Sequence, residues 1–119
     1  MAVAELGAVV LDCPDPTALA HFYAALLGGK VEQQEDWVDL TGITGTPLAF
    51  QAAPDYVPPR WPRADGSQQF HLDLTVRDLD AAEREVLALG ATVLEADDRE
   101  RTFRVYADPA GHPFCLCAC

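Results

Sequence analysis

The chain has 119 residues, of which 50% are hydrophobic and 23% are charged, a composition typical of one globular domain and not of a disordered segment. With 19 acidic and 8 basic residues, its formal net charge at pH 7 is −11. Such a surface repels phosphate backbones and anionic lipid headgroups, so we expect no nucleic-acid or membrane partner; a neutral or cationic small molecule is the better match. The acidity would serve solubility equally well without any ligand.

The first residues show no basic segment followed by a long apolar run, so we predict a cytoplasmic protein. In that reducing compartment the four cysteines, Cys13, Cys115, Cys117 and Cys119, are expected to be thiols. The spacing of the last three, C-x-C-x-C, differs from the C-x₂-C of zinc ribbons and redox dithiols.

Residues 7–15 form an apolar run that ends at a turn signal, and they predict a strand. Asp15 and Pro16 then predict the N-cap and first turn of a helix, because an Asp side chain accepts backbone N–H groups there and proline is tolerated at the first helical position. Apolar residues recur every three or four positions until Gly28 and Gly29 end the helix. Three short extended segments are predicted after it: 30–34, 36–41 and 47–52.

The second half of the chain repeats this order. Residues 70–77 alternate and predict a strand, and residues 78–90 predict a helix that ends at a glycine. Extended segments are predicted again over 91–97, 102–107 and 113–118. The Gly-Thr-Pro that begins at Gly45 matches the Gly-His-Pro that begins at Gly111, each before the last strand of its half. The Pro-rich stretch 53–69 is predicted to connect the halves.

The repeated order predicts an α+β fold of two tandem βαβββ modules within a single domain over residues 1–119. Module one spans 5–52, the connector 53–69 and module two 70–119. Neither four-stranded sheet closes on itself. We therefore expect the two sheets to curl side by side into a U-shaped mixed sheet around a cleft, where ligand sites tend to lie.

Three segments carry a resemblance to a known family: LDCPDPTALAHFYAALLGG, HLDLTVRDLDAAEREVLALGATVL and VYADPAGHPFCLC. With them the chain resembles the vicinal oxygen chelate (VOC) superfamily, also called the glyoxalase/bleomycin-resistance family, and in particular its bacterial glyoxalase-like subgroup. The resemblance implies the paired-module fold, a U-shaped cleft and frequent homodimers. It implies no single reaction, because members include isomerases, dioxygenases, epimerases, thiol transferases and metal-free proteins that sequester drugs. Function must therefore be argued from the site.

The resemblance also implies where a metal would bind, since the family's ligands lie on the first and last strands of each module. Those four positions are Ala8, Ala49, His71 and Cys115. Methyl groups cannot bind a metal, and one His with one Cys falls short of the three His and carboxylate ligands that such a site needs. Shifting the register by one residue does not restore the site. We therefore predict no metal and no cofactor.

Strand alternation places His71 and Asp73 on one face of the strand 70–77, away from its leucines. With Asp12 of module one they form a candidate binding or acid–base cluster on the inner wall of the cleft. A hydrogen-bonded scaffold in which His71 orients a carboxylate is the alternative, and both stay open. Cys115 faces the same site and is interpreted as a small apolar filler, since an acidic protein does not favour a thiolate.

Five aromatic side chains are candidates for the ligand-binding wall: Trp37, Phe50, Tyr56, Trp61 and Phe103. Aromatic faces beside carboxylates suit a flat or extended, partly cationic organic ligand, through stacking and cation–π contact. For Trp37 and Phe103, packing in the core is the alternative.

Two classes of function follow. The first is a metal-free small-molecule binding protein that sequesters an aromatic or cationic natural product, as bleomycin-resistance proteins do, in a role resembling antibiotic resistance. The second is an enzyme of the superfamily, of lyase, isomerase or dioxygenase type, that uses a metal or uses His71 with Asp73 or Asp12. A metabolite sensor is a third possibility. We also expect a homodimer, because the sheet edges are open and the resembled family often dimerises.

Overall fold

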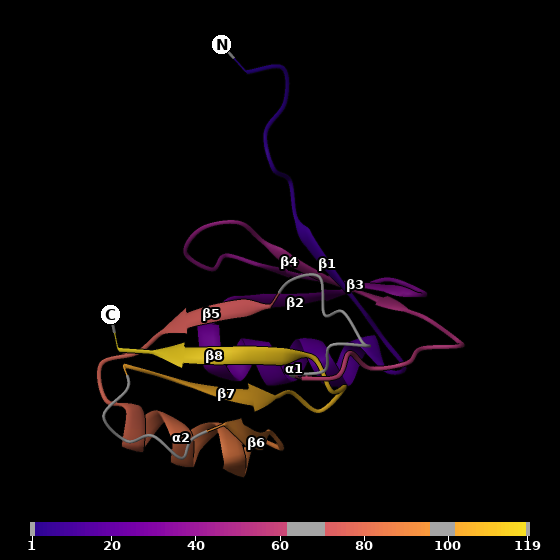
Figure 1. Cartoon of the computed structure of the whole chain (residues 1–119). Helices are drawn as coiled ribbons and strands as arrows, with labels where there is room; N and C mark the ends of the chain where they lie inside the picture. The colour runs from indigo at the N-terminus through magenta and orange to yellow at the C-terminus, as the bar shows by residue number, and fades with distance from the viewer. Residues whose placement is uncertain (1, 62–70, 96–101, 119) are drawn as a thin grey trace. The chain divides into compact units, whose positions relative to one another are not determined.

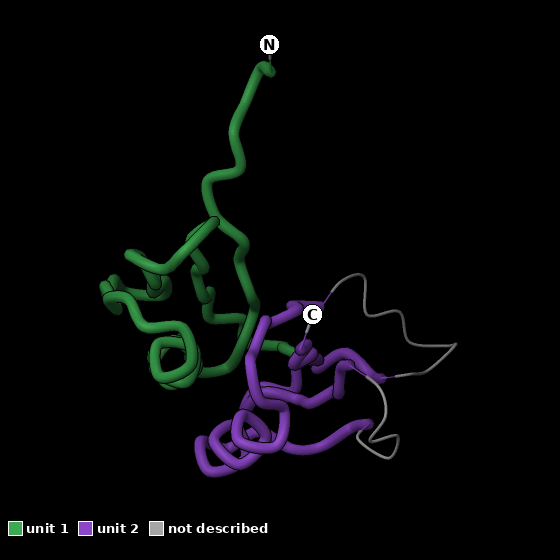
Figure 2. Tube along the Cα trace, turned by 90° about the vertical axis from the view of Figure 1, so that its left-hand side faces the viewer, with its two compact units in different colours: residues 1–56 green, residues 57–119 purple. Residues whose placement is uncertain are grey.

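The computed structural model describes residues 2–61, 71–95 and 102–118. The chain divides into two units, residues 1–56 (unit 1) and residues 57–119 (unit 2), which Figure 2 colours separately. In the described residues, each unit contains one helix and one four-stranded sheet (Figure 1). Residues 62–69 of the predicted connector 53–69 lie outside the described residues, and the assignment of both units to one domain stays a prediction.

Unit 1 contains β1 (Val9–Cys13), α1 (Pro16–Leu27), β2 (Lys30–Gln33), β3 (Trp37–Thr41) and β4 (Leu48–Ala52). Its strand order is β1-β4-β3-β2, in which β1 and β4 are parallel and the other neighbours are antiparallel. Helix α1 packs on β3 and β4. In this core Tyr23 stacks on Phe50, with ring centroids 5.8 Å apart.

Local sequence explains where α1 begins and ends. The carboxylate of Asp15 accepts a hydrogen bond from the Ala18 backbone N–H at 3.1 Å, which satisfies one of the free donors of the first turn. After the helix, Gly29 has φ of 89°, and a Cβ atom there would lie 2.5 Å from the Thr41 carbonyl oxygen. Both the backbone conformation and the available space therefore require glycine at position 29.

Unit 2 contains β5 (Leu72–Thr75), α2 (Leu79–Ala88), β6 (Thr92–Glu95), β7 (Phe103–Ala107) and β8 (Pro113–Cys117). Its strand order, β5-β8-β7-β6, and its strand directions repeat those of unit 1. The carboxylate of Asp78 accepts from the Ala81 N–H at 3.1 Å, so α2 has the same Asp cap as α1.

One face of the unit 2 sheet contacts α2. The Arg104 side chain of β7, 5% exposed, places Nη2 2.8 Å from Asp80 Oδ1 of the helix. Two residues along the same strand, Tyr106 donates its hydroxyl hydrogen to Glu83 Oε1 at 2.8 Å. Because side chains alternate along a strand, Phe103, the first residue of β7, points to the opposite face.

The turn before β8 is built by Asp108, a buried residue whose carboxylate accepts the backbone N–H groups of Ala110 at 2.9 Å and His112 at 3.0 Å. Gly111 has φ of 92°, and a Cβ there would lie 2.7 Å from a Pro58 side-chain atom. The Asp-Pro-Ala-Gly-His-Pro motif therefore forms the turn that leads into β8, and His112 takes part in this turn through its main chain.

All ten predicted elements are present in the predicted order, and the α+β fold of two βαβββ modules is confirmed. The strands predicted over 70–77 and 91–97 each extend at one end beyond the described residues. Within the described part of the chain, neither α1 nor α2 combines the length and the apolarity that crossing a bilayer by a helix would demand.

Candidate functional site

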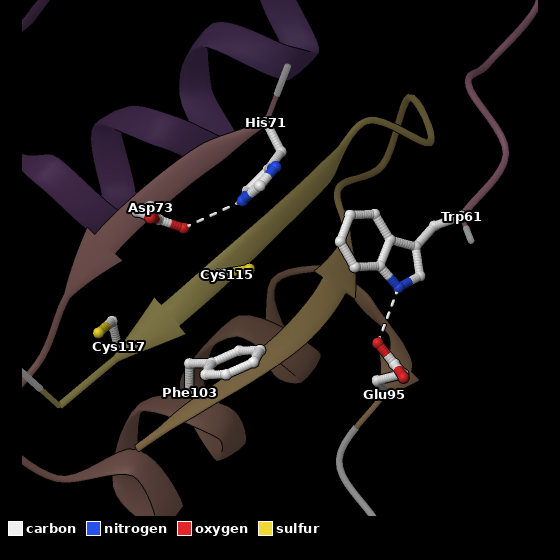
Figure 3. A pocket seen from close by; sticks show the side chains of 7 residues that line it. All are labelled: Trp61, His71, Asp73, Glu95, Phe103, Cys115 and Cys117. Atoms are coloured by element: carbon white, nitrogen blue, oxygen red, sulfur yellow. Dashed lines mark hydrogen bonds and ion pairs between the residues drawn. The ribbon is translucent and has the colours of Figure 1, made fainter. Parts of the chain in front are cut away.

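A pocket of about 380 Å³ opens on the face of the unit 2 sheet that α2 does not cover (Figure 3). This is within the usual size range of small-molecule sites, roughly 300–1,000 Å³. Among the residues that the structure describes, seven side chains line it: Trp61, His71, Asp73, Glu95, Phe103, Cys115 and Cys117. Five of them, all except Glu95 and Cys117, are candidates from the sequence.

Strand register brings these side chains together. Asp73 of β5 lies directly opposite Cys115 of β8, and Phe103 of β7 lies opposite Cys117. His71 precedes Asp73 by two residues and therefore points to the same face. Trp61 comes from the segment before β5, so the pocket combines four strands with a loop residue.

Two polar contacts fix the geometry of the pocket wall. His71 Nε2 lies 3.3 Å from Asp73 Oδ1, and Trp61 donates its indole N–H to Glu95 Oε2 at 2.9 Å (Figure 3). The rings of Trp61 and His71 meet edge to face, with centroids 5.5 Å apart and planes at 79°. The side chains of His71 and Asp73 are 32% and 69% exposed, so solvent reaches this wall.

Cys115 is a buried, free thiol. Burial raises its pKa to about 12, and the negative charges of Asp73 and Glu95 and a hydrogen bond with Asp73 act in the same direction. The residue is therefore a neutral thiol at physiological pH and a poor nucleophile. Cys117, by contrast, is disulfide-bonded, so the expectation that all four cysteines are thiols is wrong for this residue.

The other candidates lie in unit 1, outside this pocket. Phe50 is fully buried and stacks on Tyr23, so its ring packs in the core of unit 1 and offers no face to a ligand. Trp37 is half-buried and donates its indole N–H to Asp39 Oδ1 at 2.8 Å. Asp12 is exposed on β1, and Tyr56 is half-buried at the end of the unit.

Regular strand alternation would predict Glu95 on the wrong face of the sheet, away from the pocket. Val93 is opposite Tyr106, whose side chain contacts α2, whereas Glu95 is opposite Val105 because the register shifts between the two. Such a bulge reverses the face to which the following side chain points. Without the bulge, Glu95 would share the face of Val93 and would not reach Trp61.

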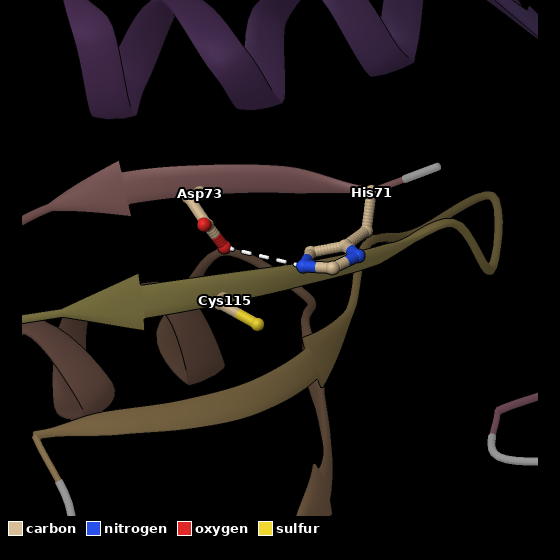
Figure 4. A group of neighbouring side chains, drawn as sticks. All are labelled: His71, Asp73 and Cys115. Carbon is tan, nitrogen blue, oxygen red and sulfur yellow. Dashed lines mark ion pairs between the residues drawn. The ribbon is translucent and has the colours of Figure 1, made fainter. Parts of the chain in front are cut away.

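The metal that the family resemblance implies does not fit its four positions. Ala8 and Ala49 belong to unit 1 and provide no donor atom, which leaves His71 and Cys115 in unit 2. The structure adds a donor that we did not count from the sequence. Asp73 offers a carboxylate oxygen, and the donor atoms of His71, Asp73 and Cys115 all lie within 4.8 Å of one another (Figure 4).

Comparison with known proteins agrees with the fold. A family model described as a glyoxalase-like domain matches residues 8–117. No curated protein matches the chain. Among solved structures, it is similar to a glyoxalase/bleomycin resistance protein/dioxygenase family enzyme from Burkholderia phytofirmans, with 19% identity and a TM-score of 0.71 over 95% of this chain and 97% of that one.

Two further solved structures have similar scores. A glyoxalase family protein from Enterococcus faecalis is 20% identical, with a TM-score of 0.66 over 97% of this chain and 98% of that one. A protein from Agrobacterium tumefaciens is 21% identical, with a TM-score of 0.71 over 98% of each chain. At these identities the likeness is one of fold, so the chemistry must come from the pocket.

Proposed function

The chain belongs to the glyoxalase-like domain family, and we propose that it is a small-molecule binding protein that sequesters a flat aromatic or cationic natural product without altering it. The observation that carries this proposal is the lining of the unit 2 pocket, where Trp61 and Phe103 stand beside the carboxylates of Asp73 and Glu95. Tight binding of a toxic compound lowers its free concentration by mass action, which is a resistance role that requires no metal and no reaction.

Charge decides which ligand this pocket favours. Two carboxylates line it, and within the described residues His71 is the one lining side chain that can become positive. His71 lies against Asp73, whereas Glu95 uses Oε2 for the Trp61 indole and turns a carboxylate toward the pocket. A cation in the pocket would meet uncompensated negative charge next to two aromatic faces.

These contacts set the expected selectivity. A cation over an aromatic face contributes about 0.5–2 kcal/mol, and the Coulomb attraction of a carboxylate about 4 Å away contributes roughly 1–4 kcal/mol. Because about 1.4 kcal/mol is a factor of ten in affinity, the pocket should prefer a flat cation to its neutral isostere by at least roughly tenfold.

The test uses two probes of one shape, N-methylacridinium and neutral acridine, at slightly alkaline pH with EDTA present. Quenching of Trp61 fluorescence in the Trp37→Phe protein reports binding at this pocket. We expect the cation to bind at least about tenfold more tightly, and Glu95→Gln to remove most of that preference. Glu35→Gln is the matched control, because it removes the same charge from an exposed site in unit 1.

Equal affinity for the two probes would overturn the proposal, and so would an unchanged preference in Glu95→Gln. Mass spectrometry of the ligand recovered after denaturation provides the second readout. Sequestration predicts that natural ligands captured by the protein are recovered chemically unchanged.

One observation favours a second candidate, an enzyme of the superfamily. His71 Nε2 lies 3.3 Å from Asp73 Oδ1, the arrangement in which a carboxylate orients an imidazole as a general base. This candidate predicts an altered product whose formation His71→Gln abolishes while probe binding persists. Recovery of unaltered ligand contradicts it.

A further inference from the structure

The geometry points to a second occupant of the same pocket wall: we propose that His71, Asp73 and Cys115 bind a divalent cation of the zinc class (Figure 4). This site lies wholly within unit 2 and does not depend on the proposed organic ligand. Two of its donors, His71 and Cys115, are at family positions, but the third, Asp73, is at none of them, and the other two family positions are alanines, so the donor set differs from the one that the resemblance implies.

Distances between the donor atoms suit a small tetrahedral ion. Ligand atoms about 2.0–2.1 Å from a tetrahedral zinc are roughly 3.3 Å from each other. His71 Nε2 and Asp73 Oδ1 are already 3.3 Å apart. The thiol sulfur of Cys115 lies within 4.8 Å of both, on the residue directly opposite Asp73 across the β5–β8 pair, so a small side-chain movement brings all three donors to one ion.

The donor types select the metal. One sulfur, one imidazole nitrogen and one carboxylate oxygen match zinc or cobalt, which accept mixed ligands in a tetrahedron. Magnesium, manganese and calcium favour oxygen ligands and six or more positions, which this wall does not provide. On binding, zinc replaces the thiol hydrogen of Cys115, which leaves to solvent as a proton.

Three protein donors leave one position of a tetrahedral ion for water or for a donor atom of a molecule in the pocket. The surroundings support such an ion. Cys115 is only 4% exposed, Glu95 adds a second negative charge to the pocket, and the Trp61 ring fixes His71 by its edge-to-face contact. Neighbouring groups that orient a metal ligand strengthen binding.

The experiment titrates the intact, EDTA-treated and dialysed chain with Co²⁺, without reductant, and follows absorbance. We expect one Co²⁺ per chain, a thiolate-to-cobalt charge-transfer band and displacement by Zn²⁺ but not by Mg²⁺ or Mn²⁺. His71→Gln, Asp73→Asn and Cys115→Ser should each weaken binding by more than about tenfold, since even an indirect partner of a ligand is worth that much. Cys13→Ser is the matched control, because Cys13 is the buried free thiol of unit 1.

Thermal unfolding is a second readout. It compares the wild-type protein with Asp73→Asn and therefore does not require the Cys115→Ser variant to fold. Zn²⁺ should raise the Tm of the wild-type protein and leave that of Asp73→Asn unchanged, because Asp73 is largely exposed and its substitution spares the core. A missing charge-transfer band, or equal binding by Asp73→Asn, overturns the site. The organic-cation test is run in EDTA, so either proposal can fail without the other.

Discussion

Gly28 and Gly29, the pair that ends α1, illustrate how two identical residues serve different purposes. Both have positive φ, 76° and 89°, a conformation that costs other residues energy. A Cβ at Gly28 would meet nothing within 4 Å, whereas a Cβ at Gly29 would lie 2.5 Å from the Thr41 carbonyl oxygen and 2.8 Å from an Ile43 methyl. Gly28 serves the helix end, and Gly29 also allows β3 to pass.

Alanine at each position separates these two costs. We expect Gly28→Ala to lower the free energy of unfolding by about 1 kcal/mol, the cost of positive φ alone. Gly29→Ala should cost more, above about 2 kcal/mol, because the new methyl group also overlaps backbone atoms. Urea unfolding with unchanged m-values measures the difference, and equal midpoints for the two variants would contradict it.

At the scale of elements, the two halves of the chain use the same device to begin their helices. Asp15 and Asp78 each accept a backbone N–H three residues later, at 3.1 Å in both cases. The two helices otherwise differ, since α1 buries four residues and α2 buries Val86 alone. Polar contacts also hold α2 to its sheet, from Arg104 to Asp80 and from Tyr106 to Glu83.

Replacing either cap with alanine should lower the free energy of unfolding by about 1 kcal/mol. Asparagine keeps an oxygen acceptor at the same place, so Asp15→Asn and Asp78→Asn should stay close to the wild-type stability. Chemical denaturation of the four variants checks this. An Asn variant that loses as much as its Ala counterpart would show that charge, and not the cap hydrogen bond, matters.

At the scale of the whole molecule, each sheet leaves two edge strands, β1 and β2 in unit 1 and β5 and β6 in unit 2. Apolar side chains are exposed on some of these strands, with Val10 on β1 and Val93 and Leu94 on β6. Open edges with apolar side chains favour association with another chain. The charge of −11 on every chain opposes it.

We therefore expect a homodimer whose stability increases with ionic strength, because salt screens the repulsion between two acidic chains. Light scattering at micromolar concentration should give twice the chain mass of 12.9 kDa, and added salt should shift the dissociation on dilution to lower concentrations. A mass of 12.9 kDa at every salt concentration would count against the dimer.

The sequence by itself determined the elements, their order and the repeat, because those signals are local. Aspartates cap helices, glycines end them, and alternation marks strands wherever the chain lies in space. The same alternation identified His71 and Asp73 as facing one way, and the family resemblance placed Cys115 beside them. Phe50 was a candidate because it lies on the last strand of module one, and the structure places its ring against Tyr23 in the core.

Only the tertiary structure decided which of these side chains meet. The register of β5 against β8 sets Asp73 opposite Cys115 and turns two separate candidates into a triad of donors with His71. The irregularity between Val93 and Glu95 brings a carboxylate to the pocket that regular alternation would send to α2. Register and bulges depend on pairing between residues far apart in the chain, and no local pattern of the sequence encodes them.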